Sequence, residues 1–282
     1  MELIRPFDPW GDELCTCTKK LSINPYTGCS HRCAYCYITS YIPRAFECRP
    51  KKELIKRVAR EASKLKTGIP VSMCNSSDPY PHAEKKLMLA RGCLEIFKEY
   101  GIPVLIVTKS DIVLRDADLL RNMDCVLSFT ITSLRPQIYK KLEPNAPPPE
   151  RRLDALKKLA EAGIPCTVRL DPLIPFVNEG DIEQVVEAAA SCGAAHITSS
   201  TFKPRPDSWR RVTSAFPHSE MKKLYGHGEM RKNYQLLPRD ERCRLMEKVR
   251  DECKKYGVTF GACREGVDIN TGKSCDGGHL LS

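Results

Sequence analysis

The chain has 282 residues, a formal net charge of +10 and 15 cysteines. This length allows one large hydrophobic core, and α/β barrels commonly occupy it as a single domain. No apolar run approaches the roughly 20 residues that span a bilayer, and the N-terminus lacks the charged and apolar regions of a secretory signal. We therefore expect a cytoplasmic protein whose cysteines bind metal or pack as small core residues, and not a disulfide framework.

Residues 1–20 have no regular periodicity and contain two prolines and a glycine, so we interpret them as an N-terminal arm. From residue 21 to about residue 200, short apolar runs alternate with segments of helical periodicity. The predicted strands span residues 21–26, 69–74, 104–108, 125–131, 166–170 and 196–199. The predicted helices span residues 50–66, 84–100, 114–122, 150–162 and 181–192, the last one capped by the carboxylate of Asp181.

This succession of six strand and helix units predicts parallel strands, because a parallel pair requires a crossover connection. Six units are fewer than the eight that close a full barrel. The predicted fold class is therefore α/β, an open partial (β/α)6 TIM-type barrel over residues 21–200, with its site at the carboxyl ends of the strands. Residues 201–282 lose the periodicity, apart from a helix over 239–256, and we interpret them as an extension packed on the core.

The stretch from Ile23 to Tyr37 carries three cysteines, Cys29, Cys33 and Cys36, in the spacing C-x3-C-x2-C. A structural zinc ion takes four ligands, usually as two pairs, and no second pair lies nearby. An iron–sulfur cubane has four irons, so three thiolates leave one iron free for a ligand that is not protein. The odd number of thiolates therefore indicates an iron–sulfur cluster with an open iron.

This motif, with the aromatic Tyr35 before its third cysteine, resembles the cluster motif of the radical S-adenosylmethionine (SAM) enzymes. Three later segments, 78–86, 108–110 and 141–144, resemble the branch that contains spore photoproduct lyases and proteins similar to "DNA repair photolyase". The resemblance implies a 4Fe-4S cluster, SAM bound to its open iron, and reductive cleavage of SAM to a 5'-deoxyadenosyl radical that abstracts a substrate hydrogen. It also implies a reducing electron donor such as a ferredoxin or flavodoxin.

The polar loop after the second predicted strand can contact the amino-acid part of a cofactor, or it can be an ordinary turn held by side-chain hydrogen bonds. Arg169 lies inside a predicted strand, where a charge requires a partner. The resemblance assigns cofactor contacts to Tyr35, Asn75, Ser76, Asp78, Lys109, Ser128, Thr130 and Arg169. Cys74 resembles the cysteine that donates a hydrogen atom in spore photoproduct lyases, and its alternative role is that of a small buried residue at the end of a strand.

A second group of cysteines lies in the arm and the tail, at Cys15, Cys17, Cys263 and Cys275. Chain termini often lie close together, and four thiolates can hold zinc or a second iron–sulfur cluster. Their spacings are not standard for either metal site, so free thiols in irregular segments are the alternative. We therefore state an auxiliary metal site as a hypothesis.

Three hypotheses about the function remain open. The positive net charge and the basic, aromatic stretch over residues 203–250 favour chemistry on a nucleic acid. The same chemistry on a small metabolite or a peptide in the open mouth of the barrel is the second hypothesis. A non-enzymatic iron–sulfur protein that binds or senses redox state is the third, and it predicts no 5'-deoxyadenosine.

Overall fold

The computed structural model describes residues 2–7, 12–65, 68–73 and 76–282. Its centre is a curved eight-stranded sheet in the order β1-β2-β5-β6-β7-β8-β9-β12, in which every strand except β1 runs parallel to its neighbour. The strands are β1 (Arg5–Pro6), β2 (Leu21–Ile23), β5 (Val71–Met73), β6 (Val104–Thr108), β7 (Cys125–Thr130), β8 (Cys166–Leu173), β9 (His196–Thr201) and β12 (Thr259–Ala262). The predicted partial barrel is confirmed.

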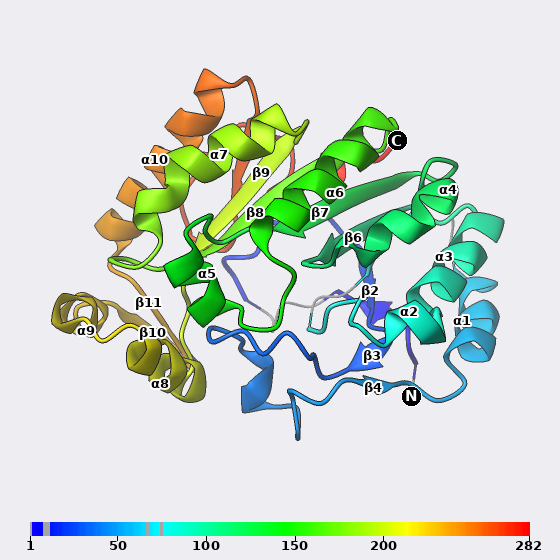
Figure 1. Ribbon diagram of the computed structural model, residues 1–282, viewed down its shortest axis with the longest axis horizontal. Coiled ribbons are helices and arrows are strands. Elements are labelled where there is room, and N and C mark those ends of the chain that lie inside the picture. The colour runs from blue at the N-terminus through cyan, green and yellow to red at the C-terminus, as the bar shows by residue number, and fades with distance from the viewer. Residues whose placement is uncertain (1, 8–11, 66–67, 74–75) are drawn as a thin grey trace.

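Helices lie along the outer side of this sheet (Figure 1). They are α1 (Leu54–Ala62), α3 (Leu89–Glu99), α4 (Ala117–Leu120), α6 (Pro149–Glu161), α7 (Ile182–Ser191) and α10 (Arg239–Lys255). Each turns an apolar stripe inward, as α1 does with Leu54, Val58 and Ala62 at a spacing of four residues. The core consists of these stripes and the outward-facing strand residues. No helix in the described part of the chain has both the length and the apolar composition needed to cross a bilayer.

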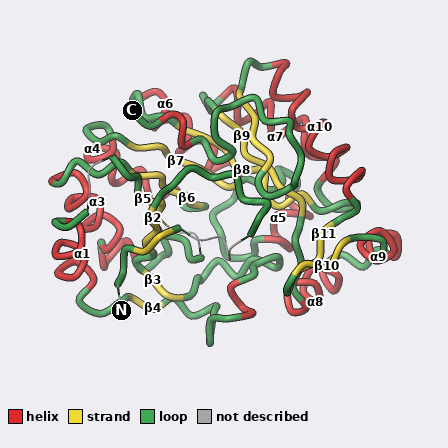
Figure 2. The backbone as a smooth tube through the Cα atoms, turned by 180° about the vertical axis from the view of Figure 1, so that it is seen from behind, coloured by secondary structure: helices red, strands yellow, loops and turns green. Residues whose placement is uncertain are grey.

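The remaining elements surround the open side of the sheet. Helices α8 (Pro206–Ala215) and α9 (Ser219–Gly226) and the hairpin of β10 (Glu229–Arg231) and β11 (Tyr234–Leu236) gather at one end of the molecule (Figure 2). The short elements are β3 (Tyr26–Thr27), β4 (Arg49–Pro50), α2 (Glu84–Leu87), α5 (Pro136–Leu142) and the 3-10 helices η1 (Ile38–Ser40), η2 (Asp111–Asp116), η3 (Glu179–Asp181) and η4 (Gly278–Leu280).

Three helix predictions and one strand prediction were wrong in detail. The strand expected over 21–26 ends at Ile23, and Tyr26 belongs to β3 in a separate two-stranded sheet. The helix expected over 114–122 is the 3-10 helix η2 followed by the four residues of α4. The helix expected over 84–100 is divided into α2 and α3, because Met88 adopts a φ of 52° between them. Asp181 does not cap α7 with its side chain. Its carboxylate instead accepts from Arg135, with Nε to Oδ1 at 2.6 Å, so a tertiary ion pair replaced the local cap.

The C-terminal extension contributes a strand to the core sheet, which the sequence did not indicate. Strand β12 pairs with β9 in parallel, so the sheet continues beyond residue 200. The strand contains Gly261, where an added Cβ would lie 2.5 Å from Cα of Cys275. The glycine is therefore needed for the close approach of the tail, although it weakens the strand signal in the sequence.

The N-terminal arm and the C-terminal tail meet where the barrel is open. Asp12 pairs with Arg264, and Lys20 pairs with Asp276. These contacts join the segment before β2 to the segment after β12, which are the first and last parallel strands of the sheet. We call residues 12–20 and 263–276 together the seam.

Candidate functional site: a cavity between the cysteine loop and the seam

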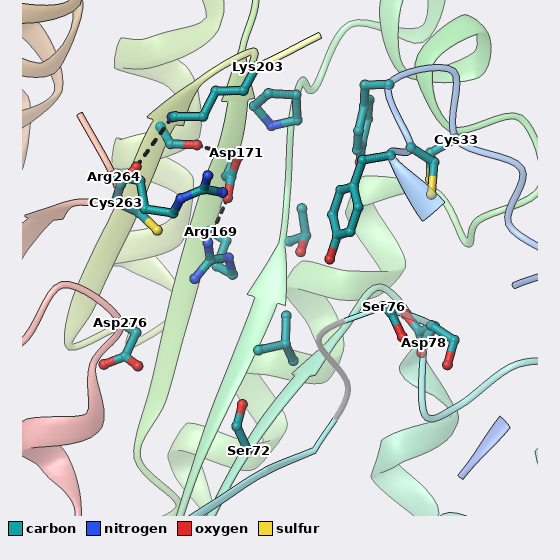
Figure 3. Close-up of a pocket in the computed structure, with 18 of the residues that line it drawn as sticks. Cys33, Ser72, Ser76, Asp78, Arg169, Asp171, Lys203, Cys263, Arg264 and Asp276 are labelled. Carbon is teal, nitrogen blue, oxygen red and sulfur yellow. Dashed lines mark hydrogen bonds and ion pairs between the residues drawn. The ribbon is translucent and has the colours of Figure 1, made fainter. Parts of the chain in front are cut away.

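A cavity of about 650 Å³ lies at the carboxyl ends of the parallel strands and reaches into the barrel. Thr108, Thr130 and Thr201 line it at the ends of β6, β7 and β9. Figure 3 shows Cys33, Ser76 and Asp78 on one side of this cavity and Arg169, Cys263 and Arg264 on the opposite side. The site is thus at the end of the sheet where parallel α/β folds carry their ligands.

The cysteine loop follows β3 and turns sharply at Gly28, which has a φ of +77°. A Cβ on this residue would lie 2.3 Å from the carbonyl oxygen of Glu47. The next residue, Cys29, donates its backbone N–H to the Ala45 carbonyl at 2.8 Å. Only glycine allows this close approach, and the approach fixes the start of the loop. Cys29, Cys33 and Cys36 all line the cavity.

The loop is also held by residues far along the chain. The backbone N–H of Ala34 donates to the Leu142 carbonyl at 2.8 Å. Arg211 of α8 donates to the Cys36 carbonyl at 2.6 Å and to the Ala34 carbonyl at 3.0 Å. Arg211 was not predicted as a site residue, because in the sequence an arginine in this basic stretch resembles any solvated charge.

Burial raises the pKa of the Cys29 and Cys33 thiols to about 12 and that of Cys36 to about 11. Deprotonation of these thiols therefore requires a cation that replaces their protons. Across the described residues, no three His, Cys, Asp or Glu side chains surround one point closely enough for a single metal ion. An iron–sulfur cluster has no such requirement, because its thiolates bond to different irons. The three soft thiol ligands thus fit a cluster.

A buried polar network holds the cysteine loop in place. The Tyr35 hydroxyl donates to Glu143, and Glu143 pairs with Arg152 at 2.5 Å, both side chains being fully buried. Arg152 also donates to the carbonyl of Thr130 at 2.9 Å, so the network joins the loop to the end of β7. The Lys109 ammonium lies 5.6 Å from the centre of the Tyr35 ring. Arg152 was not predicted as a site residue, because an arginine in a predicted helix is expected to be exposed, whereas here it is fully buried.

Asp78 organises the loop after β5. One of its oxygens accepts from the Thr108 hydroxyl at 2.7 Å, and the other accepts from the backbone N–H of Lys109 at 2.7 Å. His31 of the cysteine loop lies 3.2 Å from the second oxygen. Burial alone would raise the pKa of Asp78, but His31 and the backbone N–H groups of Lys109 and Tyr80 lower it to about 2. Asp78 therefore connects the cysteine loop to β6 as an anion.

Asn24, which the sequence analysis did not select, holds the same loop from the end of β2. Its side-chain oxygen accepts from the Ser76 hydroxyl at 3.1 Å and from the Ser76 backbone N–H at 3.2 Å. The available signal was its position, a polar residue directly after the first parallel strand. Cys74 and Asn75 lie outside the described residues.

The opposite wall is charged. Arg169 of β8 pairs with Asp171 at 2.6 Å, and Asp171 also accepts from the Ser200 hydroxyl at 2.7 Å. Arg169, which the sequence placed inside a predicted strand, therefore has Asp171 as the partner that its charge requires. Lys203 pairs with the buried Glu265 behind this wall.

The fold brings most of the predicted site residues to one cavity. Those that line it are Tyr35, Ser76, Asp78, Lys109, Thr130 and Arg169. Ser128 is fully buried in β7 and does not line the cavity. Cys17 and Cys263 of the auxiliary group also line the cavity, and the Sγ atom of Cys17 is 3.7 Å from that of Cys275.

The open parallel sheet with a three-cysteine loop at the carboxyl ends of its strands places this protein among the partial-barrel α/β folds. The sequence profile of the family described as "Radical SAM superfamily" matches residues 23–189, more than half of the chain. The chain belongs to the radical SAM superfamily. A 4Fe-4S cluster and SAM as cofactors follow from this membership.

The names of the similar proteins describe those proteins and not this chain. An uncharacterized protein of Methanocaldococcus jannaschii is 33% identical over 181 residues, which are 59% of this chain and 64% of the relative's length. A spore photoproduct lyase complexed with dinucleoside spore photoproduct is similar in structure, with a TM-score of 0.66, 16% identity and coverage of 91% of this chain and 77% of that chain. Streptococcus suis SuiB bound to the precursor peptide SuiA has a TM-score of 0.56 and 16% identity, covering 83% of this chain and 46% of SuiB. At these identities the structural likeness concerns the fold alone.

Proposed function

We propose that Cys29, Cys33 and Cys36 bind the 4Fe-4S cluster, that SAM binds beside them, and that the substrate is a nucleic acid. When bound, the cluster and SAM supply a 5'-deoxyadenosyl radical that abstracts a hydrogen atom from the substrate. The observation that supports this proposal is that all three cysteines and six of the predicted cofactor residues line one cavity. Its volume of about 650 Å³ lies within the roughly 300–1,000 Å³ of small-molecule sites.

The residues of the cysteine-loop wall are suited to bind SAM. The Lys109 ammonium lines the cavity and lies 5.6 Å from the centre of the Tyr35 ring, so a carboxylate bound there can reach it, and Tyr35 presents an aromatic ring beside the cluster cysteines. The hydroxyl groups of Ser76 and Thr130 face the same cavity and can satisfy ribose or amino-acid groups. The network through Glu143 holds the ring of Tyr35 in place.

The charge of the cavity supports an anionic substrate. Its basic side chains, seven against three acidic ones, are Arg5, Lys20, Lys109, Arg169, Lys203, Arg205 and Arg264. Four of them, Lys20, Arg169, Lys203 and Arg264, are already in ion pairs, so the positive excess of the cavity is smaller than this count. The whole chain carries +10, and phosphates are the anions that distinguish a nucleic acid from most peptides and metabolites. A cavity of this size admits one unit of a polymer, so the reacting nucleotide would enter unstacked, from single-stranded or locally opened substrate.

The experiment is anaerobic reconstitution followed by measurement of 5'-deoxyadenosine with a chemical reductant. Parallel reactions contain single-stranded DNA, duplex DNA, RNA, a peptide mixture or no substrate. We expect one polynucleotide class to stimulate the reaction, and its effect to decrease as salt rises, because salt weakens phosphate contacts. Stimulation by peptides alone would overturn the nucleic-acid proposal, and the absence of 5'-deoxyadenosine in every reaction would favour the non-enzymatic alternative.

We also propose that a reducing protein such as a ferredoxin or flavodoxin delivers the electron. Replacing the chemical reductant by reduced flavodoxin, and in a separate reaction by reduced ferredoxin, tests this directly. Turnover with flavodoxin at a rate similar to that with the chemical reductant supports the proposal. No turnover with either protein donor would contradict it.

A further inference from the structure

The seam contains four cysteines that are distant in sequence and neighbours in space. The Sγ atoms of Cys17 and Cys275 are 3.7 Å apart, although 258 positions separate them in the chain. The Cys275 thiol also interacts with Cys263, and the Cys17 thiol interacts with Cys15. Each of the four thiols therefore has at least one other thiol as a neighbour.

The distance between the sulfur atoms of Cys17 and Cys275 matches one edge of a tetrahedral site for one ion. With metal–sulfur bonds of about 2.3 Å, the edge of a tetrahedron of thiolates is about 3.8 Å. The distance between Cys17 and Cys275 has this length, whereas a disulfide bond is about 2.05 Å and uses only two of the four thiols. With these cysteines as thiols, no three His, Cys, Asp or Glu side chains of the described residues lie close enough together to hold one metal ion. Closing the site therefore requires side-chain rotations.

The backbone that carries these thiols is already fixed. Cys275 packs against Gly261, where any side chain would collide with it. Cys263 donates its backbone N–H to the Ser199 carbonyl at 2.8 Å, and Cys15 donates to the Asp12 carbonyl at 2.9 Å. These contacts anchor the backbone at Cys15, Cys263 and Cys275. We therefore expect rotation about side-chain bonds to bring the sulfur atoms around an ion.

The surrounding charge is also suitable. Four thiolates around a divalent ion leave a net charge of −2, which requires nearby cations when it is partly buried. Lys20 interacts electrostatically with Cys17 and Cys275. Arg169 and Lys203 interact in the same way with Cys263. Asp276, whose Oδ2 lies 3.9 Å from Sγ of Cys17, is held in an ion pair with Lys20, and Asp12 is held in one with Arg264.

We propose that Cys15, Cys17, Cys263 and Cys275 form a tetrathiolate site for one soft divalent ion, zinc being the ion that fits the geometry. The bound ion joins the arm to the tail across the seam. It thereby forms part of the cavity wall opposite the cysteine loop, because Cys17 and Cys263 line that cavity. This site is separate from the three cysteines of the loop and does not depend on the proposed substrate.

The test uses the full chain with Cys29→Ser, Cys33→Ser and Cys36→Ser, so that only the seam thiols remain as a thiol cluster. After removal of bound metal and titration with zinc, we expect about one equivalent to bind. Adding Cys275→Ser lowers the zinc affinity at least about tenfold, because one of four ligands is lost. Cys48→Ser in the same background is the matched control and leaves binding unchanged. Cobalt in place of zinc should give the visible absorption of a tetrahedral thiolate site.

A second measurement needs no change to the seam cysteines. In the variant without the loop cysteines, bound zinc should protect Cys15, Cys17, Cys263 and Cys275 from alkylation, as mapped by mass spectrometry, and leave Cys48 as reactive as before. The proposal is overturned if zinc protects none of the four. It is equally overturned if the seam holds iron with acid-labile sulfide in place of a single ion, or if anaerobically purified protein contains a Cys17 to Cys275 disulfide.

Discussion

The two walls of the cavity are built in different ways. The cysteine-loop wall comes from one continuous segment, with its three cysteines within eight residues and its turn set by Gly28. The seam wall combines the arm and the tail, and its thiols meet across 258 positions. Figure 3 shows the two walls facing each other. A radical SAM motif can therefore be contiguous in sequence while the surface that faces it depends on the curvature of the whole sheet.

The supports of the two walls also differ. Backbone hydrogen bonds and the fully buried pair of Glu143 and Arg152 hold the loop. Ion pairs between arm and tail hold the seam. We therefore expect damage to the loop wall to abolish chemistry, and damage to the seam wall to loosen the structure and its metal content while the radical SAM cluster survives.

The largest effect should come from Cys36→Ala. It removes one of three proposed cluster ligands, so 5'-deoxyadenosine formation should fall to the level of a reaction without protein. Cys48→Ala, a nearby thiol outside the motif, should retain both the iron content and the activity. Activity of Cys36→Ala comparable with that of Cys48→Ala would remove Cys36 from the ligand set.

The next largest effect should come from Arg152→Met, which leaves Glu143 charged and buried without its partner. We expect a loss of about 3–5 kcal/mol in the free energy of unfolding, measured by anaerobic urea titration. The neighbouring Arg151→Met is the matched control. Its side chain is 58% exposed, so its ion pair with Asp111 should contribute less than about 1 kcal/mol. Equal losses for the two variants would show that the buried network does not support the loop.

A smaller effect is expected from Gly28→Ala, compared with Gly68→Ala. Both glycines have a positive φ, and only at Gly28 would a Cβ also collide with backbone. Gly68→Ala should therefore cost about 1–2 kcal/mol from backbone strain alone. Gly28→Ala should cost more and should also lower the iron bound per chain after reconstitution. Identical iron content in the two variants would argue against the close approach at the start of the loop.

The smallest effect concerns the seam. Gly261→Ala should push Cys275 away, lowering stability by about 1–3 kcal/mol and weakening zinc binding. Iron at the cysteine loop should remain at its normal level, which distinguishes the two walls. Gly226→Ala, at a position where a Cβ meets no atom within 4 Å, is the control. If Gly261→Ala and Gly226→Ala bind zinc equally well, the position of the tail at Cys275 is not needed for the proposed metal site.

Much of the fold could be predicted because its signals are local. The apolar runs that became β2 and β5 to β9, and the helical periodicity between them, are properties of short windows of sequence. The ion pair of Asp181 was not visible there, since it depends on Arg135 from another part of the chain. The division at Met88 was not visible either, because no glycine or proline marks it in the sequence. Strand β12 was not predicted, because it has only four residues and one of them is Gly261, which the close approach of the tail requires.

The site divides in the same way. The sequence by itself determined the three-cysteine motif, the glycine before it and the placement of polar residues after each strand. Only the tertiary structure decided that Arg152 is buried, that Arg211 holds the cysteine loop and that Cys17 meets Cys275. Spacing along the chain encodes contacts within a turn or a loop. Contacts between the arm and the tail exist only once the curved sheet has brought its first and last parallel strands together.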